Sequence, residues 1–161
     1  MIFILSVFIS LNACSQKKDP VSVIESFIND AMINQKKDSL TLNKYLESYN
    51  LTEDNKSNIN LISYFIDLGK EEFQDRSYKI IPYSDIKPGS NLQDQKLFTD
   101  LEYDSKENLF YAIDKEKNEI ITFFVFKNSK IISFFPYMHK GSTKIVPYEL
   151  DKKPDYNKNP Y

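Results

Sequence analysis

Three carboxylates alternate with other residues at Asp100, Glu102 and Asp104. In an extended chain every second side chain points to the same side, so these groups would share one strand face and could gather a calcium ion. The stretch departs from an EF-hand loop, because Ser105 stands in place of its glycine and Tyr111 in place of its closing glutamate. A solvated strand face is therefore the preferred interpretation, and no metal site is predicted.

Other catalytic patterns are missing from the sequence. His139 is the only histidine, so it is the only imidazole that could act as the general base for a nucleophile. The 3 glycines, at positions 69, 89 and 141, are too scattered for a phosphate-binding or dinucleotide-binding loop. A zinc site would need a cluster of cysteines and histidines, which the chain lacks. We therefore predict no catalytic residue and no cofactor, and we favour a protein that is not an enzyme.

The most informative residue is Cys14, the only cysteine, which directly follows an apolar run. Residues 2–11 are apolar except for two serines, and this run is too short for a membrane-spanning helix, which needs about 20 residues. Its length is typical of the apolar region of a secretory signal, although the amino terminus supplies the only positive charge before it. The run ends in LNAC at residues 11–14, and residues 15–19 are polar at once.

This arrangement resembles the lipobox of bacterial lipoproteins, in which a leucine, a variable residue and a small residue precede the acylated cysteine. The resemblance implies that residues 1–13 are a signal peptide, that Cys14 carries the lipid and that residues 14–19 form a tether. The membrane would then be a partner through the lipid anchor. The composition, rich in Lys, Asn and Ile with Arg76 as its only arginine, resembles that of Bacteroidota lipoproteins. Ser15 is not the aspartate that retains lipoproteins at the inner membrane, so the cell envelope, and its outer membrane in particular, is the expected location.

Composition excludes one class of function and limits the stabilising interactions. The chain has 21 Lys and Arg against 23 Asp and Glu, a net charge of -2, which lacks the basic excess of a nucleic-acid-binding protein. With its single cysteine lipidated, the mature protein would hold no disulfide. Aromatic residues make up 14% of the chain and supply bulky material for a core. Residues 20–150 are predicted to form one domain, and the polar, proline-broken residues 151–161 a flexible tail.

Helices are predicted in the first half of the chain. Asp19 followed by Pro20 is a typical helix start, and apolar residues then recur at three- and four-residue spacing to about residue 35. Asp38 begins a second predicted helix that ends near residue 50. Thr52 is the expected N-cap of a third helix, which stops at or soon after Gly69.

Strands are predicted in the second half. Pro82 places the first of them at a sheet edge or strand end, because proline cannot donate a hydrogen bond to a neighbouring strand. Short polar breaks such as Asn128-Ser129 separate the later strands, as in an antiparallel meander. The predicted strands cover residues 78–83, 98–103, 109–114, 119–127, 130–138 and 143–150.

Helices followed by strands predict an α+β fold, with N-terminal helices packed on a C-terminal antiparallel β meander. This order of elements resembles the cone of the NTF2-like, or cystatin-like, superfamily. The resemblance implies a pocket between helices and sheet. Because that superfamily contains both enzymes and binding proteins, the fold alone does not select a function.

Aromatic residues occupy both faces of the predicted sheet. Phe123 and Val125 would face one side and Phe124 and Phe126 the other. One face is expected to meet the helices, and the other to line a pocket, meet another protein or be covered by curling of the sheet. The candidate ligand-binding or partner-binding surface comprises Phe110, Phe124, Phe126, Phe134 and Tyr137.

Together these patterns predict a lipid-anchored envelope protein, not an enzyme, that binds a small ligand or a protein partner through its aromatic-rich sheet. One alternative is an envelope immunity or inhibitor protein that blocks a toxin or an enzyme. Another is a small NTF2-like hydrolase, which would need polar groups that converge inside the cone.

Overall fold

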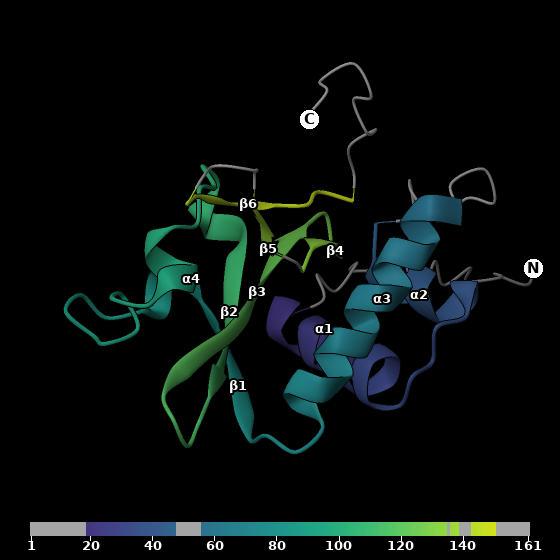
Figure 1. The fold of residues 1–161 in the computed structure, drawn as a ribbon, viewed down its shortest axis with the longest axis horizontal. Helices are drawn as coiled ribbons and strands as arrows, with labels where there is room; N and C mark the ends of the chain where they lie inside the picture. The colour runs from purple at the N-terminus through teal and green to yellow at the C-terminus, as the bar shows by residue number, and fades with distance from the viewer. Residues whose placement is uncertain (1–18, 48–55, 135, 139–142, 151–161) are drawn as a thin grey trace, which may run out of the picture.

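The computed structural model describes residues 19–47, 56–134, 136–138 and 143–150. The fold is α+β, with N-terminal helices and a four-stranded antiparallel sheet in the C-terminal half (Figure 1). The signal peptide, Cys14, most of the tether, Thr52, His139 and the tail, all singled out in the sequence, lie outside the described residues. The helical half comprises α1 (Pro20–Phe27), the π-helix η1 (Ile28–Ile33), α2 (Ser39–Tyr45) and α3 (Lys56–Phe73).

The main sheet has the strand order β1-β2-β3-β4, and every neighbouring pair is antiparallel. It confirms the predicted meander, since β2, β3 and β4 follow one another through short turns. The last of these turns is Asn128-Ser129, whose φ angles of 52° and 66° suit a two-residue hairpin. The strands are β1 (Tyr78–Pro82), β2 (Leu109–Asp114), β3 (Glu119–Lys127) and β4 (Lys130–Ser133), and a separate pair is formed by β5 (Pro136–Met138) and β6 (Ile145–Pro147).

The first two helices begin where their capping residues predict. The carboxylate of Asp19 accepts a hydrogen bond from the backbone N–H of Ser22 at 3.1 Å, and Pro20 occupies the first helical turn. Asp38 caps α2 in the same way through the backbone N–H of Thr41 at 2.9 Å. Each cap satisfies an N–H group that the helix itself leaves without a partner.

The first helix changes its winding at Ile28. From there η1 continues as a π-helix, whose wider turn is shown by the hydrogen bond from the N–H of Asn34 to the carbonyl of Asn29 at 3.0 Å. The chain then reverses at Gln35, which adopts a positive φ of 55°. This winding brings Asp30 to the hydroxyl of Tyr45 in α2.

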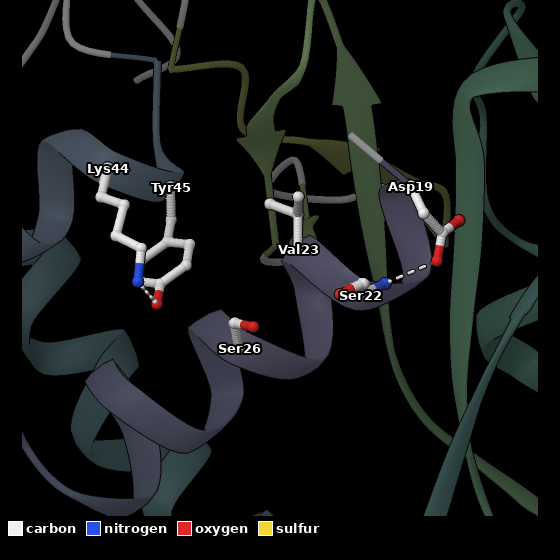
Figure 2. A pocket seen from close by; sticks show the side chains of 6 residues that line it. All are labelled: Asp19, Ser22, Val23, Ser26, Lys44 and Tyr45. Carbon is white, nitrogen blue, oxygen red and sulfur yellow. Dashed lines mark hydrogen bonds between the residues drawn. The ribbon is translucent and has the colours of Figure 1, made fainter. Parts of the chain in front are cut away.

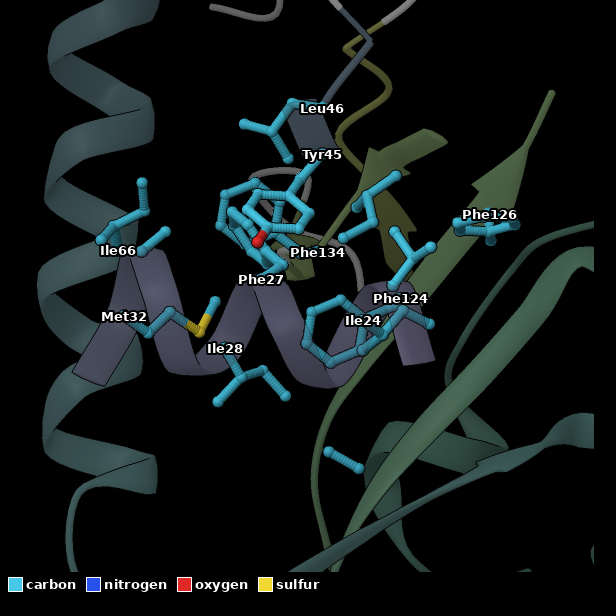
Figure 3. Close-up of a cluster of buried hydrophobic side chains, with 14 of the residues drawn as sticks. Ile24, Phe27, Ile28, Met32, Tyr45, Leu46, Ile66, Phe124, Phe126 and Phe134 are labelled. Carbon is cyan, nitrogen blue, oxygen red and sulfur yellow. The ribbon is translucent and has the colours of Figure 1, made fainter. Parts of the chain in front are cut away.

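One face of the sheet packs against the helices and forms the helix-side core (Figure 3). Phe124 and Phe126 of β3 face this core together with Phe110 of β2, as the alternation of side chains predicts. The ring of Phe27 meets the ring of Phe134 edge to face, with centroids 5.0 Å apart, and meets Tyr45 at 5.9 Å.

The opposite face is covered by the chain itself. Residues 83–103, here called the covering segment, contain the short 3-10 helix η4 (Tyr83–Asp85) and the single-turn helix α4 (Lys96–Thr99). In Figure 1 α4 lies on the side of the sheet away from α1, α2 and α3. The second core, here the segment-side core, includes Tyr111, Phe123 and Val125 of the sheet.

Two strand predictions are wrong. Residues 98–103 do not form a strand, because α4 takes up residues 96–99 and only Leu101 makes an isolated bridge, to Ile145. The predicted strand at residues 130–138 is broken into β4 and β5, which belong to different sheets. Pro136 opens β5 and has no N–H to continue the ladder of β4. In the helical half, α3 ends at Phe73, soon after Gly69 as predicted, whereas α2 stops at Tyr45, before the predicted end near residue 50.

Candidate functional site

A mainly apolar pocket of about 220 Å³ opens between the C-terminal half of α3 and the sheet, and we call it the α3 pocket. Helix residues supply one wall, and the other comes from β3 and from the chain that leaves β4. The exposed carboxylates of Glu71 and Glu72 complete the lining. The apolar and hydroxyl-bearing residues of the lining are Met32, Phe65, Leu68, Gly69, Phe73, Ile121, Thr122, Phe134 and Pro136.

The pocket lies where the fourth strand ends. β4 pairs only with residues 125–127 of β3, at the C-terminal end of that strand. The chain then leaves the sheet after Ser133. β3 itself begins at Glu119, so its first half has no described fourth strand beside it. In that half the register with β2 shifts next to Ile113, which leaves Ile121 without a partner in β2. The helix layer therefore extends past the end of the fourth strand. This leaves a gap between α3 and the first half of β3.

Gly69 lines this pocket together with Met32. A Cβ atom at Gly69 would lie 2.6 Å from Sδ of Met32, far inside van der Waals contact. The glycine costs about 1 kcal/mol of helix propensity relative to alanine, so its presence within α3 needs a packing reason. That reason is the close approach of η1, whose Met32 side chain passes over the bare backbone of α3.

Charge at the mouth of the α3 pocket is negative. Glu72 pairs with Arg76 one helical turn later, with Oε2 and Nη2 2.9 Å apart. Glu71 has no hydrogen bond or ion pair within the described part of the chain. The mouth also lies at the C-terminal end of α3, where the helix dipole adds partial negative charge.

A second, more polar pocket of about 290 Å³ lies beside the first turn of α1 (Figure 2). Several of its polar groups are already engaged, since Asp19 caps the helix and Nζ of Lys44 donates to the hydroxyl of Tyr45 at 2.6 Å. Figure 2 shows Lys44 turned toward this hydroxyl. Ser22 and Ser26, one helical turn apart, place the remaining hydroxyls there.

The ammonium group of Lys44 belongs to a network that joins α2 to η1. The hydroxyl of Tyr45 donates to Asp30, whose other carboxylate oxygen lies 3.0 Å from Nζ of Lys36. The hydrogen bond from Tyr45, followed by that from Lys36, holds the pKa of Asp30 below its ordinary value. Burial, and then the carboxylate of Asp30, raises the pKa of Tyr45. A tyrosine held in its neutral form is a poor base, so this network has a structural role.

The predicted surface residues lie mostly in the helix-side core. Phe110, Phe124, Phe126 and Phe134 are all buried there. Phe134 also lines the α3 pocket, whereas Phe110 and Phe126 line another pocket, of about 360 Å³, near Pro20. The backbone of Tyr137 pairs with Val146 between β5 and β6. Contact of these five residues with a ligand stays a prediction.

The alternating carboxylates are not gathered by a strand. Glu102 and Asp104 are exposed, and both line an open hollow of about 400 Å³ with Lys127 and Glu149. In the described part of the chain, no group of three or more His, Cys, Asp or Glu side chains is placed to hold a metal ion.

The resemblance to the NTF2-like cone implies a pocket between helices and sheet, but apart from Phe134 the lining of the α3 pocket was not predicted, because its residues come from four separate segments. Two signals point toward it. Gly69 interrupts an otherwise good helix, and Leu68 lies off the buried stripe formed by Ile62, Ile66 and Phe73.

The chain matches no protein-family model, no curated protein and no solved structure. Across the described residues, no helix combines the length and the apolar character needed to span a bilayer.

Proposed function

We propose that this chain is a lipid-anchored binding protein of the cell envelope that is not an enzyme. In this proposal Cys14 carries the anchor, and the α3 pocket accepts an apolar group of a small ligand. The observation that carries the proposal is the α3 pocket itself, which combines an apolar lining with the buried ring of Phe134 from the aromatic-rich sheet region.

The size and chemistry of the α3 pocket fit part of a ligand. Small-molecule sites usually measure about 300–1,000 Å³ and are lined mainly by apolar side chains with a few polar groups. At about 220 Å³ this pocket lies below that range, so it suits a short hydrocarbon group. The hydroxyl of Thr122 and the carboxylates at the mouth are the polar groups that could orient the rest of the ligand.

The lining also favours binding over catalysis. Its polar side chains are one hydroxyl and two carboxylates, and neither carboxylate is hydrogen-bonded to the hydroxyl. An activated nucleophile would need such a base within hydrogen-bond reach. The hydrolase alternative therefore has no support from this pocket.

The anchor can be tested separately from the pocket. In a Gram-negative host the wild-type chain is expected to sediment with membranes and to incorporate labelled palmitate at Cys14. The Cys14→Ala variant should lose the palmitate label and shift to the soluble fraction. Unchanged labelling of this variant would refute the lipid anchor.

The pocket is tested with a neutral probe, n-pentanol, added to the full chain in non-ionic detergent. The ¹³C-labelled ε-methyl of Met32 lines the pocket and should shift in saturable fashion. Thr122→Phe, which places a ring in the pocket, should abolish this shift. Thr99→Phe on the exposed outer side of α4 is the matched control and should leave it unchanged. An unshifted Met32 methyl in the wild-type chain would refute binding in the pocket.

A protein partner is a second candidate, favoured by two exposed apolar side chains next to the pocket mouth. Tyr64 and Leu68 are 57% and 37% exposed and stand one turn apart on the outer side of α3. A photo-crosslinking residue at position 64 should then capture a discrete envelope protein in cells, and the same residue at position 85 in η4 should not. Equal labelling at both positions would remove this candidate.

A further inference from the structure

The charge distribution around the α3 pocket selects among the ligands that its apolar lining could accept. Of the two carboxylates at the mouth, Glu72 is neutralised in part by Arg76, whereas Glu71 has no ion-pair partner among the described residues. Lys70 is not among the lining residues. The ionisable side chains that line the pocket are therefore both acidic, and the C-terminal end of the 18-residue helix α3 adds partial negative charge.

From this complementarity we infer that the ligand of the α3 pocket is a small organic cation, with a short hydrocarbon group inside the pocket and an ammonium group at Glu71. The inference rests on the proposed function and specifies its ligand class. An anionic amphiphile of the same length would place its carboxylate against Glu71 and against the C-terminal carbonyls of α3, where like charges repel.

The pocket volume sets the length of the hydrocarbon group. At about 220 Å³ the pocket is smaller than the usual range of about 300–1,000 Å³ for small-molecule sites, which limits its occupant to a short chain. A five-carbon chain with one polar head is close to this limit. It can place its alkyl part between Met32, Phe73 and Phe134 while its head stays at the mouth.

The test compares three probes of equal length, n-pentylammonium, n-pentanol and pentanoate, on the full chain in non-ionic detergent. The chemical shift of the ¹³C-labelled Met32 ε-methyl reports binding. Every variant is titrated in the same detergent, so that each probe partitions into the micelles to the same extent in all titrations. We expect pentylammonium to bind about two- to five-fold more tightly than pentanol, as for an exposed ion pair, and pentanoate to bind most weakly. In 0.5 M NaCl the advantage of the cation should shrink, because salt screens exposed charges.

Glu71→Gln keeps the shape of the side chain and removes its charge. It should sharply reduce the preference for pentylammonium, to what Glu72 and the C-terminal end of α3 still supply, and it should change pentanol binding much less. Glu102→Gln, an exposed glutamate elsewhere on the molecule, is the matched control and should preserve the preference. Equal binding of pentylammonium and pentanoate, or a preference that Glu71→Gln leaves at its wild-type size, would overturn the inference while the pocket itself stands. Failure of all three probes to shift Met32 would instead overturn the proposed function.

Discussion

The two faces of the sheet are buried in different ways. On the helix side, helices supply apolar stripes, and residues such as Ile24, Phe27 and Ile28 are fully buried in the helix-side core. On the other side an irregular segment without a long helix covers residues such as Tyr111 and Phe123 equally well. Complete burial of an aromatic sheet face therefore does not require a helix layer.

The covering segment is fastened by a few specific contacts. Phe98 stacks between Tyr83 and Tyr111, with ring centroids 5.3 and 5.8 Å away. The side chain of Gln95 accepts from the backbone N–H of Ile120 at 2.6 Å and donates to the carbonyl of Asn118 at 3.2 Å. Burial also raises the pKa of the Tyr111 hydroxyl strongly. The two faces thus differ in how they are covered, since helices pack apolar stripes on one face while ring stacking and side-chain hydrogen bonds hold an irregular segment on the other.

The largest effects are expected from matched truncations of neighbouring rings. Phe124→Ala on the helix side and Phe123→Ala on the segment side should each lower the free energy of unfolding by about 3–5 kcal/mol, because both rings are fully buried. Chemical denaturation measures both values. If Phe123→Ala cost less than about 1 kcal/mol, the segment-side core would not be a true core, and the comparison would fail.

A smaller effect is expected at Gln95. Gln95→Ala leaves the N–H of Ile120 without its partner and should cost about 1–3 kcal/mol. Hydrogen exchange should show faster opening of the covering segment while the amides of β2 keep their protection. Gln93→Ala, whose side chain accepts only from the exposed N–H of Gly89, is the control. Uniform loss of protection across both faces would contradict a separate weakness of the segment.

The helix layer has an acid-sensitive contact at Asp30. Asp30→Asn should cost about 1–2 kcal/mol at neutral pH, because hydrogen bonds from Tyr45 and Lys36 favour the carboxylate. Since the pKa of Asp30 is lowered in the folded chain, this stability is present above the unfolded pKa of about 3.9 and is lost as the pH falls through the lower folded value.

Unfolding measured against pH should therefore be less acid-sensitive below about pH 4 in Asp30→Asn than in wild type. The remaining acid sensitivity belongs to other carboxylates such as Asp114, whose pKa is lowered mainly by the backbone N–H of Lys117. The exposed Asp94→Asn serves as control and should follow the wild-type curve. If the free energy of unfolding of Asp30→Asn fell as steeply below about pH 4 as that of wild type, the contact at Asp30 would make no contribution to stability.

The smallest effect is expected at the start of the helix layer. Asp19→Ala removes the cap of α1 and should lower the free energy of unfolding by about 1 kcal/mol. Asp19→Asn keeps a capping oxygen and should restore most of that loss. Equal losses in both variants would mean that the charge, and not the cap, matters at this position.

Local signals in the sequence predicted a large part of the fold. The caps at Asp19 and Asp38 and the strands β2 and β3 lie where residue types and alternation place them, because each depends on neighbours in sequence. The strand predicted at residues 98–103 is wrong for a tertiary reason. Phe98 and Leu101 both pack on the sheet with three-residue spacing, and this contact outweighs the alternation of the stretch.

The resemblance implies a pocket between helices and sheet, but the place and lining of the α3 pocket could not be predicted from local signals. They depend on where β4 stops relative to β3 and on the approach of Met32 to Gly69, which are distances between segments far apart in the sequence. Nor could alternation alone say which sheet face the helices would cover. Phe123 and Phe124 are adjacent residues of the same type, so the sequence does not show which of them faces the helices. Packing places Phe124 in the helix-side core and Phe123 in the segment-side core.

The order of the elements also has a consequence for synthesis. All the helices of the helix layer lie before residue 74, whereas the strands that cover their apolar stripes, apart from β1, begin at Leu109. A chain emerging from the ribosome at about 5–20 residues per second therefore presents Ile24, Phe27 and Ile28 for several seconds before their partners exist. Because the helices cannot bury these side chains alone, the nascent chain is expected to stay unfolded and to depend on chaperone binding until most of it has been made.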